Sequence, residues 1–208
     1  MYNPKSFKVT DREKIVEFVR KNSLGLLISY SDGEFYTSHI PFLVNNECTI
    51  LTGHLARANP QWRNLDKKKA LIIFLGINHY ISPTWYNERG AVPTWNYISV
   101  RVSGNAKIIS DESTIMKIVD DLSDFFEPMY GGKWKADWED KQTSDMLKSI
   151  VGLQIKVTEV EGKWKLSQNH QKANKEALIK SLLNLGDHSA KEMAGEMQDL
   201  IDKSNRSS

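Results

Sequence analysis

The dipeptide Asp32-Gly33 constrains the fold most, because it lies between two strand-like runs, residues 24–30 and 35–44. Asp-Gly in this position is a strong signal for a two-residue β-hairpin, since both residues tolerate positive φ. The second run contains Pro41, which has no N–H to give to a ladder. The sequence therefore predicts a hairpin whose return strand is an edge strand or is bulged at Pro41.

The rest of the chain contains further strand-like runs and helix signals. Strands are predicted over residues 48–53, 70–75, 95–109, 153–160 and 164–166. One helix is predicted after a capping box at Thr10, a second begins at Asn59-Pro60, and a third runs from Ser110 to about Glu127. A further helix is predicted near residues 146–150, and two more, separated by Gly186, within residues 173–202. A long connection, 76–94, and a turn, 161–163, complete the order. Because hairpins dominate, the fold class is α+β with a mostly antiparallel sheet that closes as a barrel.

Composition limits the environment and the partners of the chain. The net charge is only +2, so any contact with DNA would need a local patch or a dimer surface. Cys48 is the single cysteine, which excludes an intrachain disulfide and a cysteine-built zinc site. The polar N-terminus lacks the apolar core of a signal peptide, and no run approaches the roughly 20 apolar residues of a membrane span. We therefore expect a cytoplasmic protein with no membrane partner.

The most prominent polar segment, residues 53–62, places His54, Arg57 and Asn59 just before a helix that begins at Pro60. A helix N-terminus offers unpaired amides and a partial positive charge, which suits a phosphate group. Arg57 would add a bidentate, permanently charged clamp. The alternative is an ordinary capped helix with an arginine that pairs with a surface carboxylate, and the spacing alone leaves both open.

Three further segments combine polar and aromatic side chains. Residues 37–42 form an edge strand whose free backbone groups could bond a planar ligand, although alone the pattern favours a half-buried strand with a satisfied His39. Residues 93–97 place aromatic rings around an amide, which suits either an aromatic ring system or a dimer interface. Residues 165–169 gather a cation and amides at a strand end, which is usually a solvated hairpin exit.

Several catalytic and nucleotide-binding patterns are absent from the sequence. It contains no Gly-x-Gly-x-x-Gly, no Walker loop, no Gly-x-Ser-x-Gly and no His-Glu-x-x-His. His39, His54 and His79 could in principle meet at a metal, but nothing in their spacing requires it. No catalytic residue and no metal ligand is therefore predicted.

Five blocks occur in a fixed order after an N-terminal Met-Tyr-x-Pro. They are Ser-His-Ile-Pro-Phe, Gly-His-Leu-Ala-Arg-Ala-Asn-Pro-Gln-Trp, Tyr-Ile-Ser-Pro-Thr-Trp-Tyr, Val-Pro-Thr-Trp-Asn-Tyr and Lys-Leu-Ser-Gln-Asn. Together they resemble the PaiB family, whose members are described as FMN-binding negative transcriptional regulators. The resemblance implies a split β-barrel similar to the pyridoxamine-phosphate oxidase class, working as a homodimer with FMN between subunits. We expect the split-barrel domain over residues 1–169 and a C-terminal helical extension, residues 170–208, packed on it.

The resemblance also implies which residues bind the cofactor. They are Ser38, His39, Ile40, His54, Arg57, Ala58, Asn59, Trp95, Asn96, Tyr97, Lys165 and Gln168. Arg57 and the start of the helix after Asn59 would take the phosphate. The groups at 38–40 and 95–97 would border the ring and pack on it. Lys165 and Gln168 would close the site from the second subunit.

Three functions fit this resemblance. The first is a flavin-binding repressor whose contact with a DNA operator depends on ligand or redox state. The second is a flavin-dependent oxidoreductase, because a fold does not fix a function. The third is a dimeric interaction module without flavin, against which the intact cluster from His54 to Pro60 argues weakly. DNA binding rests on the resemblance alone, because residues 163–208 carry eight Lys/Arg against six Asp/Glu and their two helices are equally a plain helical hairpin.

Overall fold

The computed structural model describes residues 1–88 and 90–206. Contacts divide the chain into two compact units: unit 1 falls within residues 1–10, 75–100 and 161–208, and unit 2 is residues 11–74 and 101–160. One boundary lies between residues 10 and 11, and the other three fall inside long strands, β6 (Lys69–Ile81), β7 (Thr94–Ile109) and β8 (Ile150–Lys165). The expected division of the chain at residue 169 stays a prediction.

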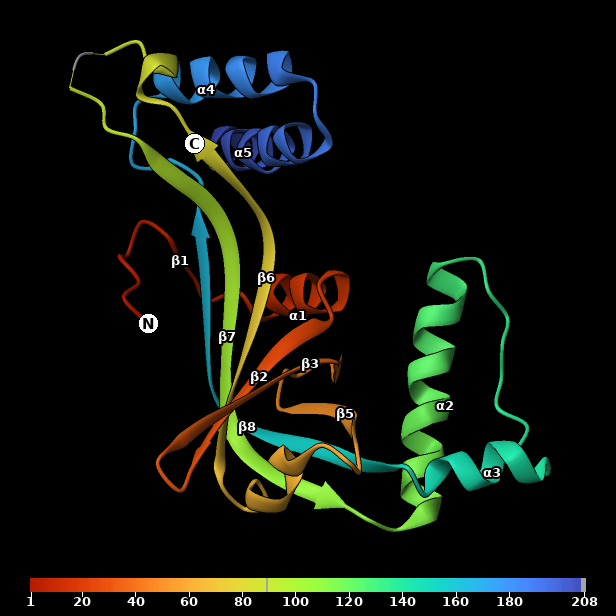
Figure 1. The fold of residues 1–208 in the computed structure, drawn as a ribbon. Helices are drawn as coiled ribbons and strands as arrows, with labels where there is room; N and C mark the ends of the chain where they lie inside the picture. The colour runs from red at the N-terminus through yellow and green to blue at the C-terminus, as the bar shows by residue number, and fades with distance from the viewer. Residues whose placement is uncertain (89, 207–208) are drawn as a thin grey trace. The chain divides into compact units, whose positions relative to one another are not determined.

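Strands β2 (Leu24–Ser31) and β3 (Glu34–Pro41) form the predicted hairpin in unit 2 (Figure 1). The two turn residues have positive φ, 54° at Asp32 and 86° at Gly33, as this kind of turn requires. β3 is the last strand in the order of the sheet and ends at Pro41. The prediction of an edge strand is therefore confirmed.

The strands belong to one sheet with the order β3-β2-β6-β7-β8-β5-β4, and β1 pairs with β8. The short strands are β1 (Lys8–Val9), β4 (Leu43–Val44) and β5 (Ile50–Ala56). Every pairing with an assigned register is antiparallel. Within unit 2, β3 also approaches β5 so closely that a Cβ on Gly53 would lie 2.7 Å from the carbonyl oxygen of Pro41. Glycine is required at this point because any side chain would separate the two strands.

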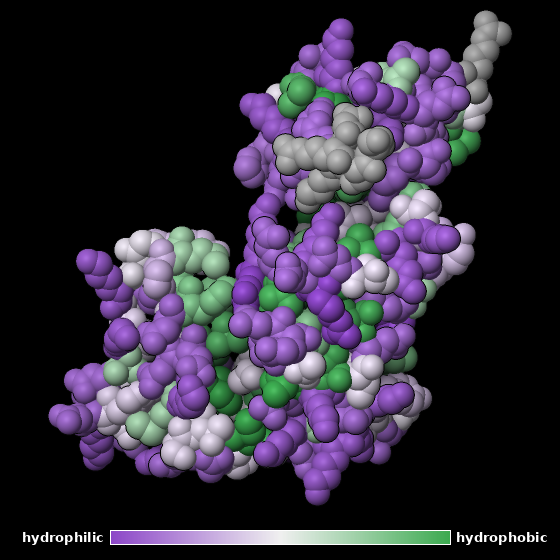
Figure 2. Space-filling view, turned by 180° about the vertical axis from the view of Figure 1, so that it is seen from behind, coloured by the Kyte–Doolittle hydropathy of each residue, from purple (hydrophilic) through white to green (hydrophobic). Residues whose placement is uncertain are grey.

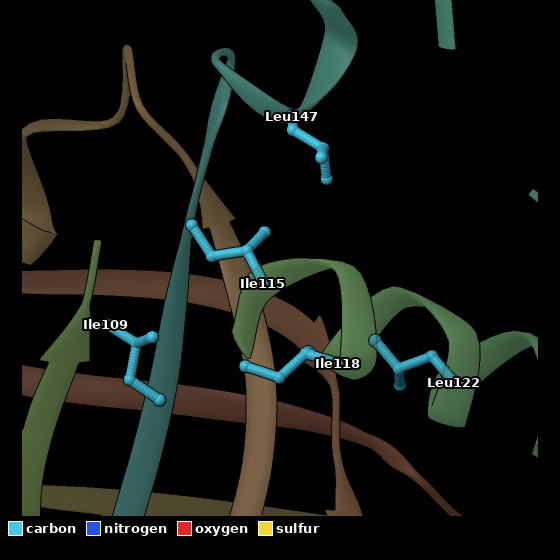
Figure 3. Close-up of a cluster of buried hydrophobic side chains, with 5 residues drawn as sticks. All are labelled: Ile109, Ile115, Ile118, Leu122 and Leu147. Atoms are coloured by element: carbon cyan, nitrogen blue, oxygen red, sulfur yellow. The ribbon is translucent and has the colours of Figure 1, made fainter. Parts of the chain in front are cut away.

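Three α-helices belong to unit 2: α1 (Arg12–Lys21), α2 (Glu112–Met129) and α3 (Lys141–Leu147). Figure 3 shows an apolar cluster in which α2 meets the end of β7 and α3; its members are Ile109, Ile115, Ile118, Leu122 and Leu147. The α2 members of this cluster are three or four positions apart, so they share one face of the helix. This cluster fixes α2 on the sheet of unit 2.

The caps of α1 and α2 are Asp11 and Asp111, and each carboxylate accepts the N–H three residues further on. The predicted caps, Thr10 and Ser110, are each wrong by one residue. Aspartate and the hydroxyl residues are comparably good caps, so two adjacent candidates cannot be ranked by propensity alone.

The predicted C-terminal pair is confirmed as α4 (Lys172–Leu185) and α5 (His188–Arg206), which pack against each other in unit 1 (Figure 1). Gly186 ends α4 with φ 76°, a left-handed conformation that glycine adopts at little cost. Their facing sides bury Leu178, Leu182, Met193 and Met197.

Two strands are longer than the sequence predicts. β6 continues to Ile81, and a 3₁₀ helix, Pro83–Trp85, follows it, so the expected connection over 76–94 is wrong in its first part. β8 runs unbroken, so the expected turn at 161–163 is also wrong, as is the helical assignment of Ile150, where β8 begins. The segment 161–163 stays extended because it pairs with β1.

The interior of each unit is packed with large apolar side chains, such as Phe42 and Phe74 in unit 2 and Trp164 in unit 1. Hydrophilic residues cover most of the face drawn in Figure 2, and hydrophobic residues show in patches between them. Within the described part of the chain, no helix has both the length and the apolar character to cross a membrane.

Candidate functional site

A hydrogen-bonded network in unit 2 joins two of the predicted segments. The side-chain amide of Asn59 donates to the hydroxyl of Ser38 at 2.8 Å, and Ser38 donates to Oε1 of Gln61 at 2.6 Å. The backbone N–H of Gln61 donates back to Oδ1 of Asn59 at 2.9 Å. These bonds close a ring between the edge strand β3 and the 3₁₀ helix Pro60–Asn64.

Gln61 anchors this network from inside the unit. Its side chain is buried, and Nε2 donates to the hydroxyl of Ser29 and to the carbonyl of Tyr36, both at 3.1 Å. A buried amide is costly unless its donors and acceptor are paired, and here they are. Gln61 is not predicted from the sequence, because a glutamine at a helix start is normally solvated; its place directly after Asn59-Pro60 is the one signal for it.

The predicted helix start at Asn59-Pro60 is confirmed, but the helix is a five-residue 3₁₀ helix. The side chain of Asn59 already accepts the first N–H of the helix, that of Gln61, so this donor is not available to a ligand. A helix this short also has little macrodipole. Phosphate binding near the exposed Ala58 would therefore depend on side-chain donors rather than on the helix end.

Arg57 is exposed, and its guanidinium is held by backbone oxygens of unit 2. Nε donates to the carbonyl of Lys148 at 2.7 Å, and Nη2 donates to that of Ile150 at 2.9 Å. Both acceptors are neutral, and no carboxylate pairs with Arg57 in the part of the chain that the structure describes. A guanidinium has further N–H donors beyond these two bonds, so Arg57 is oriented and still able to bind an anion.

The outer edge of β3 offers backbone groups to a ligand. The N–H of Phe42 donates to the carbonyl of Ser23 at 2.9 Å, so these two residues are a hydrogen-bonded pair of the antiparallel ladder. Because bonded pairs alternate along such a ladder, the backbone groups of Ser38 and Ile40 face β2, whereas those of His39 face the outer side. The side chain of His39 is exposed and that of Ile40 is buried.

His54 lies on β5 directly opposite Gly152 of β8, so both residues point to the same face of the sheet. A Cβ on Gly152 would lie 2.8 Å from Ile118, which identifies this face as the one that α2 covers. Nδ1 of His54 is buried and has no hydrogen-bond partner among the described residues. Burial lowers the pKa of His54, because the charged imidazole loses its hydration.

Unit 1 contains a cavity of ≈ 210 Å³, here named the Lys165 cavity. It is lined by Phe7, Tyr86, Val92, Thr94, Asn96, Lys165, Ser167, Asn169 and His170. The ammonium of Lys165 donates to the hydroxyl of Thr94 and, at 2.7 Å, to the carbonyl of Trp95. Burial lowers the pKa of Lys165, and the nearby charge of Lys163 lowers it further.

The other predicted residues of unit 1 are fixed by contacts within that unit. Asn96 is fully buried, and its Nδ2 donates to the hydroxyl of Ser167 at 3.0 Å. The ring of Tyr97 lies 5.2 Å from the ammonium of Lys163. The amide of Gln168 is bonded to the backbone of its own turn, where Oε1 accepts the N–H of Leu166 at 2.7 Å.

The structure therefore brings the predicted residues together in two groups. Those in unit 2 are Ser38, His39, Ile40, His54, Arg57, Ala58 and Asn59, and those in unit 1 are Trp95, Asn96, Tyr97, Lys165 and Gln168. Within unit 2, Ser38 and Asn59 touch directly, whereas His54 points to the face covered by α2.

Solved structures with this fold include flavoproteins. The flavocytochrome Anf3 from Azotobacter vinelandii superposes with a TM-score of 0.60 at 13% identity, over 76% of this chain and 69% of that one. The FAD and heme binding protein from Mycobacterium smegmatis gives 0.59 at 17% identity, over 76% and 73%. At such identities the likeness concerns the fold alone. The chain has the predicted α+β split-barrel fold of flavin-binding proteins.

The family follows from sequence comparison. Residues 1–159 match the family described as "Putative FMN-binding domain", and the chain belongs to this family. The "Protease synthase and sporulation protein PAI 2" of Bacillus subtilis (strain 168) is 34% identical over 206 residues, 98% of this chain and 99% of that protein. An uncharacterized protein of Emericella nidulans is 27% identical over 233 residues, 88% and 93% of the two chains. The predicted resemblance and the FMN cofactor are thereby confirmed.

The chemistry of the residues in unit 2 fits FMN. Arg57 supplies a permanent positive charge with donors to spare, and Ser38 and Asn59 supply a hydroxyl and an amide that the network holds in place. The outer edge of β3 adds main-chain donors and acceptors of the kind that pair with a heterocycle. A phosphate-bearing, planar cofactor needs this combination of groups.

Proposed function

We propose that this protein is an FMN-binding negative regulator of transcription that acts as a cytoplasmic homodimer, with flavin at the subunit interface. The observation that carries the proposal is the end-to-end similarity to PAI 2 of Bacillus subtilis, in which almost the whole of both chains takes part. Similarity over both units supports a shared role better than a common fold does, since one fold serves many functions.

In this proposal, Arg57 binds the phosphate of FMN, and Ser38 and Asn59 orient its polar groups. The backbone at His39 borders the ring system. The partner subunit's Lys165 closes the site, as the family resemblance implies. FMN supplies a redox-active ring when bound, so that occupancy or redox state can change the contact with an operator.

The experiment that tests the proposal is a selection from sheared genomic DNA of the source organism with purified, FMN-loaded protein. Bound fragments are sequenced after washes at about 50 and 200 mM salt. A regulator enriches a small set of fragments, and its affinity for them falls steeply with salt, because cationic side chains displace counterions from phosphates. The flavin-free protein is the control for dependence on the cofactor.

If all fragments are recovered equally, or if no fragment is recovered, the proposed regulatory role is wrong. The same preparation is then incubated with a reduced nicotinamide. Sustained oxidation of the nicotinamide with bleaching of the flavin, in the absence of fragment enrichment, would identify a flavin-dependent oxidoreductase instead.

A further inference from the structure

Two lysines of unit 1 lie on one face of β8 without a carboxylate partner. Lys163 and Lys165 are two residues apart in a strand, so their side chains project to the same side. Lys163 is 7% exposed and Lys165 is half-buried. Neither forms an ion pair with any residue that the structure describes. Buried charges are normally paired, so unit 1 carries positive charge that its own acidic groups do not balance.

The contacts of the two ammonium groups differ. Lys163 donates to the carbonyl of Tyr2 at 3.0 Å and lies over the rings of Tyr2 and Tyr97, whose π faces attract a cation. Among the described residues, Lys165 donates to the neutral oxygens of Thr94 and Trp95 alone. An ammonium has three donors, so Lys165 retains one for a further acceptor. Burial, and next the charge of Lys163, lower the pKa of Lys165.

The space beside Lys165 suits an anion. No acidic residue is among the described residues that line the Lys165 cavity. The hydroxyl of Thr94 accepts from Lys165, so its own O–H remains free to donate. His170 adds a second basic side chain, which stacks on Tyr86 with a ring distance of 4.8 Å and is oriented by Glu88 at 3.2 Å.

We propose that the Lys165 cavity binds the anionic group, a phosphate or a carboxylate, of a small molecule. With ≈ 210 Å³, the cavity is smaller than the roughly 300–1,000 Å³ of pockets that enclose a drug-sized ligand, so it takes one charged group or a very small acid rather than a whole flavin. This inference rests on contacts within unit 1 and does not require the regulatory role.

Two sources can supply such a group: the phosphate end of FMN, or a separate small anion. Inorganic phosphate and acetate are titrated into the FMN-loaded protein and into the flavin-free protein. Binding is followed by isothermal titration and by the NMR titration of the Lys165 ammonium, the donor nearest to the proposed anion. Saturable binding to both forms identifies a separate anion. Binding to the flavin-free form alone, competitive with FMN but not with riboflavin, identifies the phosphate of FMN.

The variant Lys165→Met is expected to bind the probe about tenfold to a hundredfold more weakly, because a charge-assisted bond is lost. Lys165→Arg should retain most of the affinity. Lys156→Met, at an exposed position of the same strand, is the matched control and should bind as the original protein does. If Lys165→Met does not fold, Thr94→Val tests the same cavity by removing a donor.

In the original protein, the bound anion should raise the pKa of the Lys165 ammonium. No binding of either probe to either form, or equal binding by Lys165→Met or by a folded Thr94→Val, would overturn the proposal.

Discussion

The side-chain amide of Asn59 donates a 2.8 Å hydrogen bond to the hydroxyl of Ser38, and this contact joins the cap of the 3₁₀ helix to the edge strand β3. The two residues come from separate sequence blocks, and Gln61 holds both of them. The position of each therefore depends on the others, which makes the network a unit for mutational tests.

Replacement of Gln61 should weaken both the fold and the cofactor site. Gln61→Ala removes the partner of Ser38 and Ser29, and leaving such buried groups unpaired costs about 1–3 kcal/mol. We expect the free energy of unfolding in urea to fall by that amount and FMN affinity to fall with it. Gln142→Ala, at an exposed position of α3, is the control. Unchanged stability of Gln61→Ala would show that the network contributes little.

Replacement of Arg57 should weaken the binding of FMN but not of riboflavin, which lacks the phosphate. A charge-assisted hydrogen bond contributes about 1.5–3 kcal/mol, so Arg57→Ala should bind FMN about tenfold to a hundredfold more weakly. Isothermal titration with both flavins measures the difference. Arg63→Ala removes another exposed arginine of the same unit and should leave both affinities unchanged. Equal losses for the two flavins would place Arg57 away from the phosphate.

His54 should make the protein less stable in acid. Its pKa is lowered in the folded state by burial, whereas the unfolded chain titrates near the ordinary value of 6.5. Between the lowered pKa and 6.5 the unfolded state binds more protons, so His54 reduces stability as the pH falls through this window, and its contribution changes no further below it. Urea midpoints measured from pH 8 downward should show this loss, and His54→Asn should reduce it. His188→Asn, at an exposed position, should not. The same pH profile in all three proteins would argue against a lowered pKa of His54.

Trp95 offers a test of the proposed homodimer. Its side chain is 54% exposed, and exposed tryptophans are frequent anchors of protein interfaces. Such an anchor contributes about 2 kcal/mol or more, so Trp95→Ala should weaken the dimer by about 30-fold or more and should lower flavin occupancy. Analytical ultracentrifugation and the flavin absorbance measure the two effects. Trp134 is 55% exposed in unit 2, so Trp134→Ala is a matched control. A monomeric Trp95→Ala with full flavin occupancy would contradict a site shared between subunits.

The sequence predicts local features of this fold well. The hairpin around Asp32-Gly33, the edge position of β3 and the end of α4 at Gly186 depend on the backbone preferences of one or two residues, which any reader of the sequence can assess. The blocks that resemble the family lead to the correct cofactor for the same reason, since they are contiguous in the chain.

Features that depend on distant pairing were missed. The segment 161–163 has the composition of a turn, but it lies in the ladder with β1, more than 150 residues earlier in the chain. The sequence carries no strong signal that Gln61 is buried and bonded, because its partners, Ser29 and Ser38, lie in the hairpin of β2 and β3, more than 20 residues earlier. Likewise, nothing in its sequence context indicates that Arg57 is held by the carbonyls of Lys148 and Ile150.

The ring formed by Ser38, Asn59 and Gln61 contains only hydroxyl and amide groups, so it has no proton to gain or lose across the physiological range. Its geometry, and the charge of Arg57 beside it, should be the same at pH 5 and pH 8. A pH dependence of FMN binding would then report on the imidazole of His54, on Lys165, or on the phosphate itself, whose second ionisation falls near pH 6. Because the ring of Ser38, Asn59 and Gln61 does not change with pH, any change of FMN affinity with pH can be assigned to one of those titrating groups.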